Sequence, residues 1–396
     1  MEAAEQQGRG KELRLERLAG LARAFVAVVG AVLLVGCEFV QQEPAINPAE
    51  AYIDAKTTLL QSADDKAPAT RSYAMEALAR VIGAEAGATF AQALHDESPV
   101  VRFAAALAIG DVEYKPALPA LRKMARKNTG ERDKRVFCGV IYALYRLGSD
   151  EHAGELGTLL FDEEREVRMD AALAMGKMGE PSAKGPLKTI LANEQDDGVR
   201  IQATESLALL GDSRSAEVIE AYTKGLFLDL RLAAIPALGR VGGTRAPRAL
   251  KQLIDQRHPA RVRVSAAGEL ARLGHFEREG YDLCVASVKD PQKVLEQAAK
   301  RSKRAADKDA ASLKRLAILS LGWMNRQGAV NLLHPLLDSE DGGVRVAAAL
   351  TVLRLLEAYR PAAVSPEAPA TRPVAKSPQT RPAQKRPKLQ TAKGKD

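Results

Sequence analysis

The sequence predicts an all-helical protein, an α-solenoid (an α/α superhelix) built from about nine stacked helical hairpins. Aromatic residues make up only 4% of the 396 residues, and Ala, Leu, Arg, Glu and Lys are abundant. These abundant residues lose little entropy in a helix, whereas strands favour aromatic and β-branched side chains. The second observation is a repeat of 31 or 32 residues that runs through most of the chain. Sandwiches, barrels and doubly wound sheets are therefore excluded.

The net charge of +8 lies outside the repeats. Residues 360–396 carry nine Lys/Arg against two acidic residues, and residues 1–24 carry five against four. Residues 37–359 are therefore neutral, which argues against specific nucleic-acid binding by the folded body.

The N-terminal region contains an uncharged apolar run of thirteen residues, 24–36, preceded by Arg14, Arg17 and Arg23. As a helix the run is roughly 20 Å long, shorter than the ~30 Å hydrocarbon core of a bilayer. This length is typical of the apolar segment of a signal peptide. Residues 1–36 are therefore predicted to be a signal peptide.

The run ends in Leu34-Val35-Gly36-Cys37, which resembles the lipobox of bacterial lipoproteins. The resemblance implies cleavage between Gly36 and Cys37, a lipid on the Cys37 thiol and a lipid-anchored protein in the bacterial cell envelope. Two features depart from the pattern, a long leader with four glutamates and Glu38, which gives no signal for the inner or the outer membrane. A short apolar helix with an incidental cysteine and an uncleaved anchor remain alternatives. Residues 37–64 are predicted to be a flexible tether with one short helix at 49–61.

The repeat predicts a helical hairpin in each copy. Its first helix has apolar residues three, four, seven and ten positions after the first residue of the copy. A glycine eleven positions after that residue ends the helix in a left-handed conformation, and Asn325 takes this place in one copy. A second apolar set follows at positions 19, 22 and 23. Nine copies begin at Arg71, Arg102, Phe137, Arg168, Arg200, Arg231, Arg263, Lys314 and Arg345.

This pattern resembles the bacterial HEAT-like repeats, which also occur in phycobilin lyases, and it covers about 71–359. The resemblance implies an ARM/HEAT-type solenoid over 65–359 whose concave face, made by the second helices, binds a protein or peptide partner without catalysis. A phycobilin-lyase-like enzyme and a nucleic-acid-binding HEAT protein are the alternatives.

Acidic residues precede many of the arginines that begin the copies. We expect them to cap helix starts and to pair with the arginine of a stacked neighbour, forming a structural ladder. About 20 extra residues around 286–310 interrupt the repeat. We expect these residues either to lengthen a helix or to form an additional one. Their role is either binding or that of a solvent-exposed loop without function.

The sequence contains no recognisable catalytic or metal motif, and no cofactor is predicted. None of the five histidines has metal-ligand spacing or is followed by Glu. Cys138 and Cys284 are expected to be buried and unpaired, on a first and a second helix. Trp323 is expected to pack rather than to bind a ligand. The candidate binding residues form one basic helix face, Arg122, Lys123, Arg126 and Lys127.

The C-terminal segment 360–396 is rich in Pro, Lys and Arg and is predicted to be disordered. Such a tail is expected to contact anionic lipid or envelope polymers, or only to aid solubility.

Overall fold

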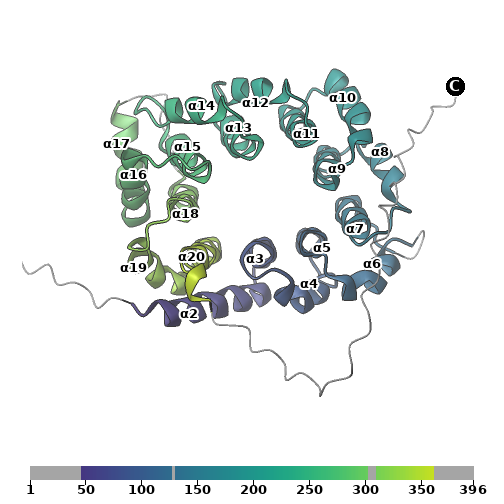
Figure 1. Ribbon diagram of the computed structural model, residues 1–396, viewed down its shortest axis with the longest axis horizontal. Coiled ribbons are helices and arrows are strands. Elements are labelled where there is room, and N and C mark those ends of the chain that lie inside the picture. The colour runs from purple at the N-terminus through teal and green to yellow at the C-terminus, as the bar shows by residue number, and fades with distance from the viewer. Residues whose placement is uncertain (1–45, 127–129, 302–308, 361–396) are drawn as a thin grey trace, which may run out of the picture. The chain divides into compact units, whose positions relative to one another are not determined.

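The computed structural model describes residues 46–126, 130–301 and 309–360. Within these ranges all regular elements are helices and no strand occurs, which confirms the all-helical prediction. Figure 1 shows the helices in two layers, and the first helix of each repeat lies in the inner one. The inner helices are α3 (Pro68–Val81), α5 (Pro99–Val112), α7 (Lys134–Arg146), α9 (Arg165–Met178), α11 (Asp197–Leu209), α13 (Leu228–Val241), α15 (Ala260–Arg272), α18 (Ala310–Leu321) and α20 (Gly342–Leu355).

The second helices form the outer layer, so the prediction that they make the concave face is wrong. They are mostly shorter, and several begin with a 3-10 turn. They are α4 (Gly87–Ala93), α6 (Leu118–Met124), α8 (Leu156–Leu159), α10 (Lys184–Asn193), α12 (Ser215–Thr223), α14 (Ala246–Leu253), α16 (Arg278–Lys289) and α19 (Ala329–Leu333).

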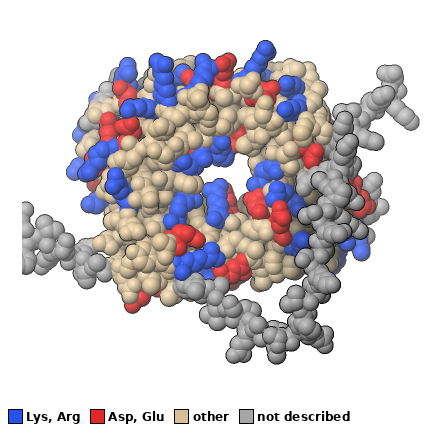
Figure 2. Space-filling view, viewed as in Figure 1, with Lys and Arg blue, Asp and Glu red and all other residues tan. Residues whose placement is uncertain are grey.

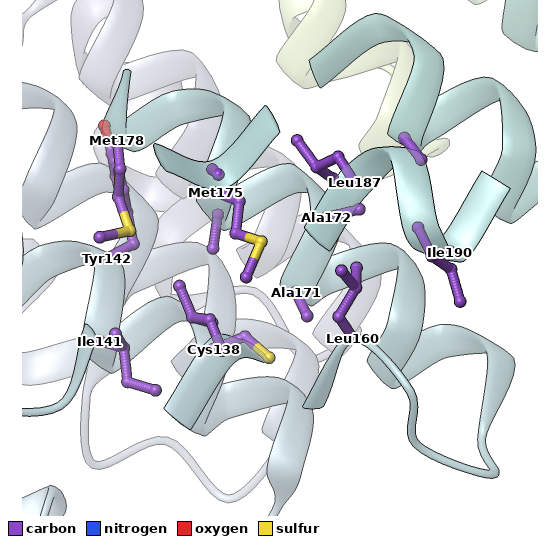
Figure 3. Close-up of a cluster of buried hydrophobic side chains, with 14 of the residues drawn as sticks. Cys138, Ile141, Tyr142, Leu160, Ala171, Ala172, Met175, Met178, Leu187 and Ile190 are labelled. Atoms are coloured by element: carbon purple, nitrogen blue, oxygen red, sulfur yellow. The ribbon is translucent and has the colours of Figure 1, made fainter. Parts of the chain in front are cut away.

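The predicted register is confirmed in the core. In the copy that begins at Arg168, the residues at positions three, four, seven and ten are Ala171, Ala172, Met175 and Met178, and all are buried (Figure 3). The small pair lets neighbouring inner helices approach closely, while the flexible methionine side chains fill gaps in the same core cluster. The expected left-handed glycines have positive φ, and Asn325 adopts φ 48° in the corresponding position.

The extra residues near 286–310 form an additional helix rather than only a longer one. After α16, α17 (Pro291–Arg301) packs against α16 and α18 in the outer layer. Leu295 and Ala298 are its buried residues. The described part of the insertion therefore belongs to the outer layer.

In several copies the arginine that begins the copy joins its own repeat to the next one. Nη1 of Arg102 donates to the main-chain carbonyls of Asp96 and Glu97, both at 3.0 Å. Its Nε and Nη2 bind the carboxylate of Glu131, in the following turn, at 2.8 and 3.1 Å. Arg168 repeats this arrangement with Glu194. These contacts confirm the predicted ladder, in which charge-assisted hydrogen bonds tie successive repeats together.

The helices from Asn47 onwards form one unit, and this unit closes into a ring (Figure 1). The last inner helix, α20, packs against α3, the first one, and against α2 (Pro48–Gln61). Up to residue 360, where the described chain ends, the ninth copy has no outer α-helix of its own, and α2 lies against α20 in that place. The repeat pattern predicted a solenoid with a concave face and did not predict that its ends meet. Closure gives each terminal repeat a neighbour, so the polar capping repeats that open solenoids need are not required.

The predicted tether, 37–64, is wrong for its second half, although the short helix expected within it is confirmed. One face of α2 carries Ala51, Tyr52, Ala55 and Leu59, each at most 1% exposed. The spacing of four residues puts this stripe on one side of the helix, where it packs mainly on α20. The alanine-rich composition that indicated a tether therefore serves close helix packing.

The junction at which α20 meets α2 and α3 is called the seam here. Side-chain contacts at the seam resemble those found between adjacent repeats. Arg345, which begins the ninth copy, binds the carboxylate of Asp65, just before α3, as Arg71 binds Asp96. Gly342 lies so close to α3 that a Cβ there would be 2.1 Å from Oγ1 of Thr70. The ladder of arginine–carboxylate contacts therefore extends across the seam.

The predicted signal peptide, Gly36, Cys37 and the tail from 361 onwards lie outside the described residues. Among the residues that the structure does describe, no helix is both long and apolar enough to span a bilayer.

Candidate functional site

A pocket of about 390 Å³ lies on the inner face of the ring. Residues five and nine positions after the first residue of a copy share one stripe of each inner helix, because four residues make about one turn. Position five of α3, α18 and α20 and position nine of α3 line the pocket, with further contributions from Leu232 of α13 and Arg261 of α15. The volume lies in the range of small-molecule sites.

The walls of the pocket are aliphatic along its middle and charged at both ends. The apolar lining comes mainly from Leu232, Leu316, Leu319, Val346 and Leu350. The inner helices all run in the same direction, so their early positions lie at one end of the pocket and their late positions at the other. Arg261 and Arg315 lie at the early end, and Arg80 with Glu76 lies toward the late end. Trp323 and Arg354 follow Leu319 and Leu350 by one helical turn and lie beside the lining rather than in it.

Position nine carries a cation in six of the nine copies, which the repeat pattern did not lead us to predict. Figure 2 shows Lys and Arg side chains gathered around the central opening of the ring. A cation in the last turn also interacts favourably with the helix dipole, so the position has a structural use as well. The six residues are Arg80, Arg146, Lys177, Arg240, Arg272 and Arg354.

Three of the cations near the pocket each have a carboxylate of their own. Arg80 pairs with Glu76 at 2.5 Å and Arg272 with Glu269 at 2.7 Å. Arg240 pairs with Glu205 on the neighbouring inner helix. Burial raises the pKa of Glu269, although Arg272, Arg240 and Arg80 all act to lower it. These groups therefore interact across the interior of the ring.

Arg354 is different, because it has no carboxylate partner among the described residues. Its guanidinium carbon lies 3.8 Å from the centre of the Trp323 ring, a cation–π contact. Burial, with a further contribution from Arg80, lowers the pKa of Arg354 to about 10, so the side chain is still charged at neutral pH. Arg272 lies over the same ring at 5.9 Å, and its buried Nη2 has no hydrogen-bond acceptor. The cluster of Arg354, Arg272 and Trp323 therefore carries more positive than negative charge.

The basic residues that the sequence singled out lie elsewhere. Arg122 and Lys123 are exposed on α6, in the outer layer, and Arg126 is exposed just after it. Lys127 lies outside the described residues. None of the three described side chains lines the pocket in the ring. Trp323 does pack, against two guanidinium groups, but it is 38% exposed rather than part of the core.

The cysteines and histidines form no site in the described ranges. Cys138 on α7 and Cys284 on α16 are fully buried free thiols, as predicted, and burial raises the pKa of Cys284 to about 12. His334 contacts Asp54 at the seam, at 3.0 Å. No group of three or more His, Cys, Asp or Glu side chains within the described residues is placed to hold a metal ion.

The turn before α13 exposes two large apolar residues. Leu226 is 76% and Phe227 69% exposed. Other copies have acidic residues in this turn, such as Asp96 and Asp162. In this copy Arg231 instead donates to the carbonyl of Thr223. Its Nη2 contacts Nδ1 of His258 in the following turn at 3.0 Å, so a histidine takes the place of the ladder carboxylate, while Leu226 and Phe227 make an apolar protrusion on the surface.

Comparison with known proteins supports the repeat assignment. The family model of HEAT repeats matches residues 57–138 and 129–208, so this part of the chain carries HEAT repeats. No curated protein matches the chain. Among solved structures, an engineered protein from the Northeast Structural Genomics Consortium is 16% identical, with a TM-score of 0.28. The match covers 76% of this chain and 98% of the engineered one.

Proposed function

We propose that the chain is a noncatalytic scaffold that binds another protein and is held at a bacterial membrane by a lipid on Cys37. The observation that carries the docking role is the exposed pair Leu226 and Phe227 in a turn that is acidic elsewhere in the ring. The HEAT repeats support the same role, because such repeats commonly present interaction surfaces.

The exposed pair has the properties of an interface anchor. Burying a Leu or Phe side chain contributes about 1.5–3 kcal/mol, and aromatic residues are frequent among the residues that dominate binding. Exposed apolar residues give no such benefit in the free protein. A partner with an apolar pocket would cover both side chains, with the acidic turns of adjacent repeats at the polar rim.

The anchor rests on the sequence alone. The apolar run 24–36 followed by Gly36-Cys37 is similar to a lipobox. One acyl chain gives marginal membrane binding, and a second makes it stable. The lipid would then hold the ring at the membrane through residues 38–46.

The docking proposal is tested by crosslinking in intact cells followed by mass spectrometry of the captured proteins. The double variant Leu226→Ser/Phe227→Ser should lose the partner that the natural chain captures, with an unchanged melting temperature. Leu209→Ser is the matched control, since Leu209 is 48% exposed at the opposite end of an inner helix. Undiminished capture by the double variant would refute this docking site.

The anchor is tested separately. Cys37→Ala should abolish both labelling with palmitate and partition into membranes, while the purified variant still captures the partner. Membrane association that persists without labelling would show that another feature holds the chain there.

A further inference from the structure

We propose that the pocket inside the ring binds an amphiphile with one hydrocarbon chain and an anionic head group, and that Arg354 beside Trp323 binds the head. This site is separate from the docking turn at Leu226 and Phe227. It rests on the charge of Arg354 beside the late end of the pocket, the chemistry of the pocket walls and the position of the single tryptophan.

The charge argument starts from the pairing of the arginines. Arg80, Arg240 and Arg272 each have one carboxylate within ion-pair distance, and Arg354 has none in the described chain. A half-buried cation without a counter-ion is costly, and its free energy falls when an anion binds. The neighbouring Arg80 adds to the unfavourable environment of the Arg354 charge, so an anion bound there would be favoured further.

The shape of the guanidinium limits which head groups can bind. Its planar fork can donate two parallel hydrogen bonds to a carboxylate or to a phosphate. One face of the Arg354 fork is covered by Trp323, which fixes its orientation. The head group is therefore an oxyanion approached from the open edge of the fork.

The walls favour a hydrocarbon over a peptide. Leu319 and Leu350 line the pocket one helical turn before Trp323 and Arg354, so the apolar wall adjoins the cation directly. All of the walls are helices, whose main-chain groups bond within the helix. An extended peptide would find few partners for its amide groups, and leaving them unpaired is costly. A hydrocarbon chain has no such requirement.

The position of Trp323 supplies a direct readout. It is the only tryptophan in the chain, so its fluorescence reports on this end of the pocket alone. The purified full chain is titrated with dodecanoate, dodecyl phosphate and dodecan-1-ol below their micelle concentrations. Tryptophan emission and calorimetry are both recorded. The two anions separate a carboxylate source from a phosphate source, and the alcohol shows what the hydrocarbon contributes alone.

We expect saturable binding of at least one anion. The alcohol should bind at least about tenfold more weakly than that anion, since a charge-assisted hydrogen bond is lost. Arg354→Gln should weaken anion binding by about tenfold or more and leave the alcohol unaffected. Arg146→Gln is the matched control, because Arg146 holds the same position in another copy and pairs with Glu113. It should bind as the natural chain does.

Two further variants keep the test informative if Arg354→Gln folds poorly. Arg354→Lys retains the charge but loses the fork, so it should bind the anions more weakly than the natural chain and still prefer them to the alcohol. Leu319→Gln, at a partly exposed position, should weaken both anion and alcohol.

Three results would overturn the proposal. One is equal affinity for the alcohol and both anions, and another is anion binding that Arg354→Gln does not change. The third is no response to either anion but an Arg354-dependent shift of Trp323 emission on adding hexaglutamate, which would assign the site to an acidic peptide.

Discussion

Closure of the ring by α2 makes a quantitative prediction for Leu59→Ala. Leu59 is completely buried on the face of α2 that packs mainly on α20. The substitution removes three carbon atoms from a buried position, at about 0.8 kcal/mol each, and leaves a cavity that adds to the loss. We expect the seam to be destabilised by about 3 kcal/mol, roughly a 150-fold change in its opening equilibrium.

The assay is amide hydrogen exchange followed by mass spectrometry, together with urea unfolding monitored by circular dichroism. Because α20 contacts both α2 and α3, exchange should accelerate together in all three helices, although they come from opposite ends of the chain. Ile53→Ala is the control, since Ile53 lies on the same helix but is 53% exposed. Equal effects of the two substitutions, or faster exchange in α2 alone, would refute closure.

Three further predictions concern the core, the seam and the ladder. Leu238→Asp should unfold its own and neighbouring repeats, because an unpaired charge at a buried position costs several kcal/mol; the melting temperature measures this. Gly342→Val should loosen the seam, because a side chain there would collide with Thr70, and hydrogen exchange of α3 would report the change. Burial acts to raise the pKa of Glu194, but Arg168 and main-chain N–H groups outweigh it and lower the pKa. Its stabilising effect is therefore present above about pH 4.3, the ordinary pKa of Glu, and is lost as the pH falls through the folded-state pKa. Melting temperatures measured between pH 7 and pH 3 should fall less steeply for Glu194→Gln than for the natural chain.

Each of the three has a contrary outcome. An unchanged melting curve for Leu238→Asp would contradict the register of the repeats. Unaltered exchange in Gly342→Val would mean that α3 and α20 do not approach closely. Parallel pH profiles for the natural chain and Glu194→Gln would show that the ladder carboxylate titrates alike in the folded and unfolded states.

The repeat architecture was predictable because its signals are local. Glycine spacing, the small pair such as Ala171 and Ala172, and Asn325 in place of a glycine all lie within one copy. Each local preference agrees with the fold, so the hairpins and their register followed from pattern alone.

Closure was not predictable in the same way, because it joins residues far apart in the chain. Arg345 and Asp65 are separated by 280 positions. Arg71, Arg102 and Arg168 bind a carboxylate of the following turn in the same way, so no residue type distinguishes the seam from these ordinary junctions. The choice of inner layer was also missed, because both helices of a hairpin have an apolar face and periodicity does not say which one lies inside.

The cluster of cations at position nine of the inner helices was partly predictable from the sequence. Aligning the copies puts a cation at position nine in six of them, a signal that the apolar pattern obscured. The isolation of Arg354 was not visible, because it depends on which carboxylates face one another across the ring. Glu269 and Glu76 come from inner helices distant in sequence, and only the fold brings both near Arg240.

Circular closure constrains how the gene for this protein can change. An open array lengthens or shortens by whole units with little consequence for the others. With nine units in a full circle, each unit turns the chain by about 40°, and a tenth would require about 36° at every junction. Duplication or loss of a single unit should therefore disturb the packing everywhere at once, so the unit number is expected to resist the drift usual in tandem arrays.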